Sequence, residues 1–236
     1  TRLQGDWSSD VCSSDLLLRH AARPTRREEL GWPEPGDLDL DATVERPRPW
    51  AAEDVRVVRA VPREIDLVAV LDLSLSISGE TLALVATAAA VLRLRLERLA
   101  VVAFDTRART LVRIEETVPP RELVRRILEV SAEGYTNLEA GLEAAARELR
   151  RSVRRERAAF VLTDGVANVG RDPVVVARRL PRLHVVHLGG HHPQGARTCQ
   201  AMATEGRGRL YRARTFEDLP QVVRRAAREL VRHSGQ

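Results

Sequence analysis

Oxygen-bearing side chains follow two apolar runs of this sequence, at the points where each run ends. Asp72, Ser74 and Ser76 come directly after the run IDLVAVL, and Asp164 lies two residues beyond the run AAFVL. Side chains of an extended backbone alternate between its two faces, so the carboxylate and both hydroxyls of the first segment can point to one side. Carboxylate and hydroxyl oxygens are the ligands that Mg²⁺ or Mn²⁺ prefers. The spacing therefore predicts a metal site at the edge of a sheet.

A fifth oxygen donor, Thr136, lies in the segment GYTN just before an expected helix. Five donors from three loops suit the octahedral oxygen shell of Mg²⁺. Thr136 has a second interpretation, because Thr136 and Glu139 form the T-x-x-E pattern of a helix capping box. The two roles are compatible, since a hydroxyl oxygen has two lone pairs.

Strands and helices must alternate along the chain to bring these donors together. Apolar runs indicate strands at 65–71, 99–104, 109–115, 158–162, 183–188 and 209–214. Helical composition or periodicity indicates helices at 80–95, 120–130, 137–152, 173–180, 195–205 and 217–232. This order predicts an α/β fold with a doubly wound, mostly parallel sheet and helices on both faces. Ligands of such sheets bind beyond the carboxyl ends of the strands, where the five donors are expected.

The order D-x-S-x-S, then Thr, then Asp resembles the metal-ion-dependent adhesion site of von Willebrand factor type A (VWA) domains. The matching residues are Asp72, Ser74, Ser76, Thr136 and Asp164. The resemblance extends over about 63–232 and implies a Rossmann-like VWA fold. It also implies that the serines and Thr136 bind Mg²⁺ directly, while the aspartates act largely through water. Leu75 departs from the family pattern, which commonly has glycine there.

The resemblance implies a protein-binding module and not an enzyme. In such modules the metal keeps one position for an Asp or Glu of a partner protein. Bacterial cytoplasmic members often work beside MoxR-type AAA+ ATPases or in chelatase-type, cofactor-insertion machines. The expected partner is therefore an AAA+ ATPase or its client. Two alternatives stay open: a metal-assisted hydrolase on the same fold, which would need a placed general base, and a nucleic-acid binder.

The basic charge does not by itself indicate nucleic-acid binding. The net charge is +5, and all 38 basic residues are arginine. Abundant Arg, Ala, Val and Leu also result from the codon usage of a GC-rich genome. Only 3% of residues are aromatic, which leaves few side chains for stacking on bases, so no specific nucleic acid is expected. No apolar run is long enough for a membrane span, and two Cys exclude a disulfide scaffold.

The chain divides into three predicted parts. Residues 1–16 contain GDWSSDVCSSDL, which resembles one reading frame of a sequencing adapter, so we expect them to be an artefact. Residues 17–62 are a leader or linker, or the tail of a missing N-terminal region; within it, 37–41 and 54–61 alternate like short strands. Residues 63–236 form the VWA domain.

Three further candidates have a structural interpretation that is favoured over a functional one. Asp105 is expected to be a turn residue, although it could add a carboxylate near the site. The histidines around His191 lack the spacing and the fourth ligand of a zinc site. Cys199 is expected to be a packed helix residue and not a nucleophile.

Overall fold

The computed structural model describes residues 25–31, 37–38, 55–62, 65–74, 80–131, 134–189, 192–215 and 217–232. The chain divides into two compact units. Within the described ranges, the larger unit runs from Ile65 to Glu229, and the smaller unit contains three strands between Arg23 and Arg63.

A six-stranded sheet forms the centre of the larger unit, with the strand order β6-β5-β4-β7-β8-β9. Its strands are β4 (Ile65–Asp72), β5 (Arg98–Phe104), β6 (Ala108–Val112), β7 (Glu156–Thr163), β8 (Leu183–Leu188) and β9 (Leu210–Ala213). All neighbours are parallel except β5 and β6, which form an antiparallel hairpin. The chain moves outward from β4 in one direction and from β7 in the other, so the strand order reverses between these two strands.

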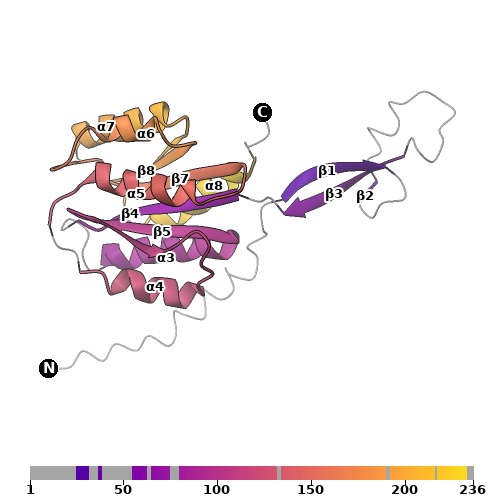
Figure 1. The fold of residues 1–236 in the computed structure, drawn as a ribbon, viewed down its shortest axis with the longest axis horizontal. Helices are drawn as coiled ribbons and strands as arrows, with labels where there is room; N and C mark the ends of the chain where they lie inside the picture. Colours follow the sequence, from indigo (N-terminus) through magenta and orange to yellow (C-terminus); the bar gives the residue numbers. More distant parts are fainter. Residues whose placement is uncertain are drawn as a thin grey trace. The chain divides into compact units, whose positions relative to one another are not determined.

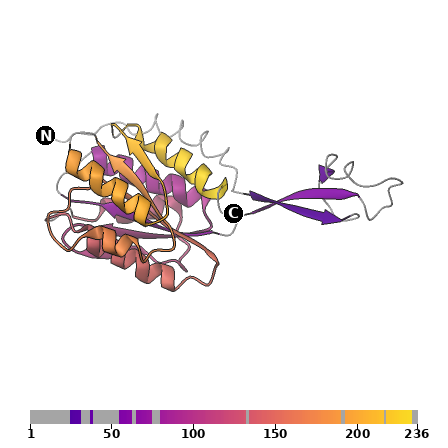
Figure 2. The ribbon, with the colours of Figure 1, turned by 90° about the horizontal axis from the view of Figure 1, so that it is seen from above.

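Helices cover both faces of this sheet (Figure 2). One face carries α3 (Glu80–Arg95) and α8 (Leu219–Arg232), and the other carries α5 (Leu138–Arg150), α6 (Pro173–Ala177) and α7 (Pro193–Glu205). Because both faces are covered, all eight residues of β4 are buried, which explains its continuous apolar run. The predicted α/β fold with a mostly parallel, doubly wound sheet is therefore confirmed. None of the helices in the described ranges is long and apolar enough to cross a membrane.

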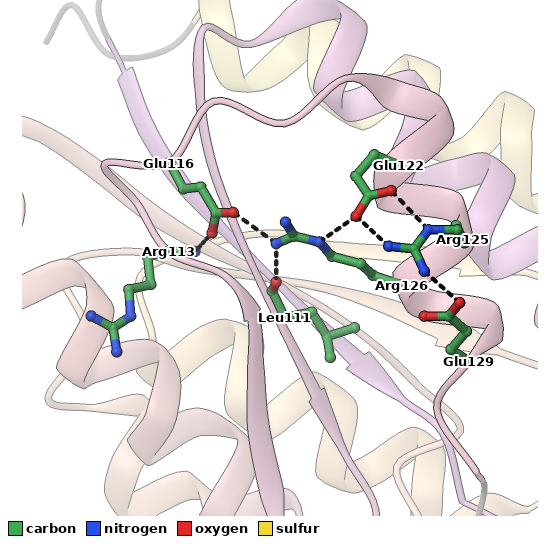
Figure 3. A network of polar contacts seen from close by, with 7 residues as sticks. All are labelled: Leu111, Arg113, Glu116, Glu122, Arg125, Arg126 and Glu129. Carbon is green, nitrogen blue, oxygen red and sulfur yellow. Dashed lines mark hydrogen bonds and ion pairs between the residues drawn. The ribbon is translucent and has the colours of Figure 1, made fainter.

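The helix α4 (Pro120–Leu128) packs against α3 and β6 at the edge of the larger unit (Figure 1). Its Arg126 guanidinium binds three acceptors: Glu122 at 3.0 Å, Glu116 at 2.8 Å and the carbonyl of Leu111 in β6 at 2.9 Å (Figure 3). Arg126 thus links α4 to the neighbouring strand and to the turn that follows it. Among the described residues, Arg125 forms ion pairs only with Glu122 and with Glu129, the C-cap residue of α4.

The smaller unit is an antiparallel sheet of β1 (Thr25–Gly31), β2 (Asp37–Leu38) and β3 (Arg56–Pro62), in the order β1-β3-β2. The sequence indicated a strand at 54–61 that could enter the main sheet. The strand exists as β3, but it pairs with β1 and β2, while both edges of β4 in the main sheet are occupied by β5 and β7. Residues 1–16 and Asp39–Asp41 lie outside the described ranges.

Candidate metal centre

Asp72 is the most deeply placed of the predicted site residues, with 1% of its surface exposed at the end of β4. Its Oδ1 accepts a hydrogen bond from the Ser74 N–H at 3.1 Å, and its Oδ2 accepts one from the Thr163 hydroxyl at 2.6 Å. Burial raises the pKa of Asp72 to about 6, and the hydrogen bonds from Thr163 and Ser74 offset only part of this increase. No arginine or histidine of the described ranges forms an ion pair with it. Asp72 is therefore a buried carboxylate without a counter-cation among the described side chains.

The end of β7 brings a second carboxylate to the same edge. β4 and β7 pair in parallel up to Leu71 and Leu162, so Asp72 and Asp164 both lie just beyond the last pair. The half-buried Asp164 accepts a hydrogen bond from the Val166 N–H at 2.9 Å. Its negative charge contributes to the raised pKa of Asp72, which shows that the two carboxylates lie within electrostatic reach of each other.

The turn after Asp164 requires glycine. Gly165 has a φ of 78°, and a Cβ at this position would lie 2.3 Å from the carbonyl oxygen of Gly195 in the first turn of α7. This close approach of the turn to α7 fixes the direction in which the chain leaves Asp164.

Thr136 is buried in a loop that two other loops hold in place. Its N–H donates to the Asn168 side chain at 3.2 Å, and its carbonyl accepts from the Asn168 N–H at 3.0 Å. The following residue, Asn137, donates its N–H to the carbonyl of Asp105 at 2.9 Å. Because Asn168 follows β7 and Asp105 follows β5, Thr136 is held at the carboxyl edge of the sheet, where the carboxylates lie.

The capping-box interpretation of Thr136 and Glu139 is wrong. The N-cap of α5 is Asn137, whose side-chain oxygen accepts from the Ala140 N–H at 3.0 Å. Glu139 instead accepts a hydrogen bond from the Arg171 N–H at 2.7 Å. The cap is displaced by one residue because Asn137 is itself a preferred N-cap residue, and the Thr136 hydroxyl is left for another role.

Ser74 is buried beside Asp72, and its hydroxyl also forms a hydrogen bond with that carboxylate. The structure thus gathers Asp72, Ser74, Thr136 and Asp164 at one edge of the sheet. Ser76 and Leu75 lie outside the described residues.

Two of the secondary candidates have the structural roles that were expected. Asp105 accepts from the Arg107 N–H at 2.8 Å and stabilises the turn between β5 and β6. Cys199 is fully buried in α7, and burial raises the pKa of its thiol to about 12, so the reactive thiolate is absent at neutral pH.

The histidines do not form a metal site in the part of the chain that the structure describes. His184 and His187 are three residues apart on β8, which turns their side chains to opposite faces of the sheet. The described residues contain no group of three His, Cys, Asp or Glu side chains that could hold a metal. His191 lies outside these residues.

Sequence reasoning assigned no role to Thr163 and Asn168, although both support the site. Thr163 donates to Asp72, and its hydroxyl oxygen accepts from the Gly165 N–H at 3.0 Å. The parallel register of β4 and β7 would have placed Thr163 opposite Asp72. Asn168 has no comparable signal, because its contact with Thr136 joins two irregular loops.

The donor set fits a hard divalent cation. Asp72 and Asp164 supply negative charge, while Ser74 and Thr136 offer neutral hydroxyl oxygens. A buried carboxylate without a counter-cation is costly, and a divalent ion at this edge would neutralise it. The donors are all oxygens, which favours Mg²⁺ or Mn²⁺ over zinc, whose protein sites commonly use nitrogen and sulfur.

The fold is similar to that of solved VWA proteins at low sequence identity. The von Willebrand factor type A protein from Catenulispora acidiphila matches with a TM-score of 0.61 and 18% identity, over 74% of this chain and 44% of that chain. Proximal thread matrix protein 1 from the mussel byssus, in a structure with a zinc-occupied MIDAS motif, gives 0.61 and 16%, over 71% and 48%. This chain spans about half the length of either protein.

A third similar structure is an aerotolerance-related membrane protein from Bacteroides fragilis NCTC 9343. It has a TM-score of 0.57 and 19% identity, and the match covers 71% of this chain and 100% of that one. No curated protein sequence matches the chain.

The sequence itself matches the family described as VWA domain containing CoxE-like protein, over residues 14–205. The match includes most of the six-stranded sheet and all of the described site residues. The fold and the sequence agree, and the chain belongs to the family of VWA domain-containing CoxE-like proteins.

Proposed function

We propose that this protein is a metal-dependent protein-binding module whose ion is held by Asp72, Ser74, Ser76, Thr136 and Asp164. The observation that carries the proposal is the buried Asp72 carboxylate, which has no counter-cation in the described ranges and accepts hydrogen bonds from the Thr163 and Ser74 hydroxyls. Membership of the VWA family supports it, because VWA domains are generally interaction modules and not enzymes.

A bound Mg²⁺ or Mn²⁺ would supply a Lewis-acidic position for a carboxylate of the partner. Ser74, Ser76 and Thr136 contribute neutral oxygens, so the cation keeps much of its charge and favours an anionic ligand over a carbonyl. Tyr135, with 64% of its surface exposed, lies directly before Thr136 and would contact such a partner at the rim of the site. The partner should therefore present an exposed Asp or Glu.

The partner we propose is an AAA+ ATPase of the MoxR type or its client. The support is the CoxE-like family to which the chain belongs. An ATPase partner would place the complex in the cytoplasm, where ATP is available. The net positive charge of the chain adds long-range attraction for acidic protein surfaces, screened over about 8 Å at physiological salt.

The test is co-purification from the native lysate in four conditions. Wild type and the Ser74→Ala/Ser76→Ala variant are each used as bait with Mg²⁺ or with EDTA. A specific partner, identified by mass spectrometry, should be present only with wild type and Mg²⁺. Calorimetric titration of Mg²⁺ into both proteins shows in parallel whether the variant has lost the ion.

Partners retained equally in all four conditions would show that recognition uses another surface. Hydrolysis of generic phosphomonoesters or esters that disappears in the serine variant would favour the metal-assisted hydrolase instead. In that case no partner carboxylate would be needed for metal-dependent activity.

A further inference from the structure

A second site lies at the opposite end of the sheet from the candidate metal centre. It is a pocket of about 420 Å³ between the last turns of α5, the segment after α6 and the beginning of β7. Arg157, near the start of β7, lines the pocket, whereas Asp164 follows the end of the same strand. The volume falls in the range of pockets that bind small organic ligands.

Four arginines line this pocket against a single acidic residue, Glu143. The four are Arg147, Arg150, Arg157 and Arg179. None of them forms an ion pair within the described residues, whereas Arg125, Arg126 and Arg151 elsewhere on the surface all do. The pocket therefore carries an excess of three positive charges, and its arginines have no acidic partners in the part of the chain that the structure describes.

Arg157 adds a second observation that points to a ligand. One of its terminal nitrogens donates to the carbonyl of Leu149 at 3.3 Å, which holds the side chain at the pocket. Its Nε is buried and has no hydrogen-bond partner among the described residues. The Arg157 guanidinium is therefore a fixed and only partly satisfied donor group in a pocket lined by three other arginines, and such a set of donors favours a bound anion.

The other wall of the pocket is apolar. Leu149, Val176 and Leu180 line it from within the core, and the half-buried Ala146 and the exposed Pro181 provide apolar surface that a ligand can contact. A bare inorganic ion would use only the arginines. A ligand with an organic part and a cluster of negative charges would use both walls.

We propose that this pocket binds a small organic molecule carrying a diphosphate or triphosphate group, such as a nucleoside diphosphate. Planar guanidinium groups bind phosphate oxygens in pairs, and a diphosphate carries enough charge to neutralise the excess of the pocket. The organic part contacts the apolar surface of Ala146 and Pro181. The site does not depend on the proposed metal centre.

The test is calorimetric titration of the whole chain with ADP, pyrophosphate, orthophosphate and a glutamate decapeptide, all in EDTA. ADP should bind most tightly and orthophosphate most weakly. Arg147→Gln/Arg179→Gln should weaken ADP binding about tenfold or more, because each variant removes a charged hydrogen-bond donor. Both arginines are exposed, so the fold should be retained, which circular dichroism checks.

The matched control is Arg113→Gln/Arg121→Gln, which removes the same charge at exposed positions that do not line the pocket. It should change ADP binding less than twofold, and Asp164→Ala should leave it unchanged. Equal losses of ADP affinity in the pocket and control variants would mean that the net positive charge of the protein attracts anions without a specific site. Orthophosphate binding as tightly as ADP, peptide binding that ADP does not displace, or no binding at all would each overturn the proposal.

Discussion

Replacing Asp164 should weaken metal binding without unfolding the protein. This residue lies beyond the end of β7, where truncation leaves no core cavity, so Asp164→Ala should abolish most Mg²⁺ binding and leave the metal-free fold intact. Val161→Ala, in the fully buried part of the same strand, should instead lower the free energy of unfolding by about 2 kcal/mol. Urea unfolding without metal and calorimetry with Mg²⁺ measure the two effects. An unfolded Asp164→Ala protein would reveal a structural role for the carboxylate.

His184 makes the fold sensitive to acid. It is buried in β8 with both ring nitrogens lacking partners among the described residues, and burial together with Arg182 and Arg209 lowers its pKa to about 4, against a small opposing effect of Glu229. As the pH falls below 6.5, the His184 side chain is therefore protonated in the unfolded chain at a higher pH than in the folded chain. The stabilisation from keeping His184 neutral in the folded state is present above pH 6.5. Between pH 7 and pH 5 the free energy of unfolding should fall by about 2 kcal/mol as this stabilisation is lost.

The measurement is the free energy of unfolding in urea at pH 7 and pH 5 for wild type and His184→Leu. The leucine side chain of the variant cannot take up the proton, so between pH 7 and pH 5 the free energy of unfolding of the variant should fall by about 2 kcal/mol less than that of the wild type. Carboxylates and the other histidines titrate in both proteins and cancel in the comparison. The same pH dependence in both proteins would contradict the assignment.

The candidate site could be predicted from the sequence only where a regular element positions the residue. Asp72 and Asp164 follow apolar strands, so the parallel sheet brings them to one edge whatever the loops do. Thr136 is predicted from its place before an expected helix and also matches the family pattern, yet its position depends on hydrogen bonds with Asn168 that join two irregular loops. Such contacts between distant loops leave no periodic signal in a single sequence.

At the level of elements, Arg126 should contribute more to stability than its neighbour Arg125. Arg126 reaches the Leu111 carbonyl in β6 and Glu116 beyond it, whereas Arg125 contacts only α4 and its C-cap residue Glu129 among the described residues (Figure 3). Exposed ion pairs within one helix contribute little to the free energy of unfolding. Replacing a side chain that links two elements also removes the contacts that hold those elements together. Arg126→Met should therefore lower the melting temperature measurably, and more than Arg125→Met does. Equal melting temperatures for the two variants would contradict a linking role.

The helices and strands of the larger unit follow from local patterns, and the smaller sheet does not. Runs such as IDLVAVL are buried on both faces, so continuous apolar character marks them as inner strands. β3 has only an alternating pattern, which indicates a strand but not its partners. Its pairing with β1 joins Thr25 to Pro62 and Gly31 to Arg56, residues far apart in the sequence, and nothing local specifies that register.

For the whole molecule, part of the high arginine content is used for internal ion pairs. Arg98 and Arg154 both lie beside the buried Asp66, Arg178 pairs with Glu205, and Arg209 pairs with Glu229. Paired arginines contribute little to a long-range field for nucleic acid. What distinguishes the pocket is that four arginines without ion pairs among the described residues line one cavity.

Metal binding should stabilise the whole larger unit, because only the folded chain brings the loops after β4 and β7 together with the Thr136 loop. A ligand that binds the native state alone adds RT ln(1 + [L]/Kd), about 2.7 kcal/mol at a hundredfold excess over Kd. For a chain of this length that corresponds to a rise in melting temperature of about 5–10 °C. Thermal melts in Mg²⁺ and in EDTA measure the rise, with Asp164→Ala as the control that should show none. Identical melts of the wild type in both buffers, with no heat of Mg²⁺ binding, would mean that the site holds no metal.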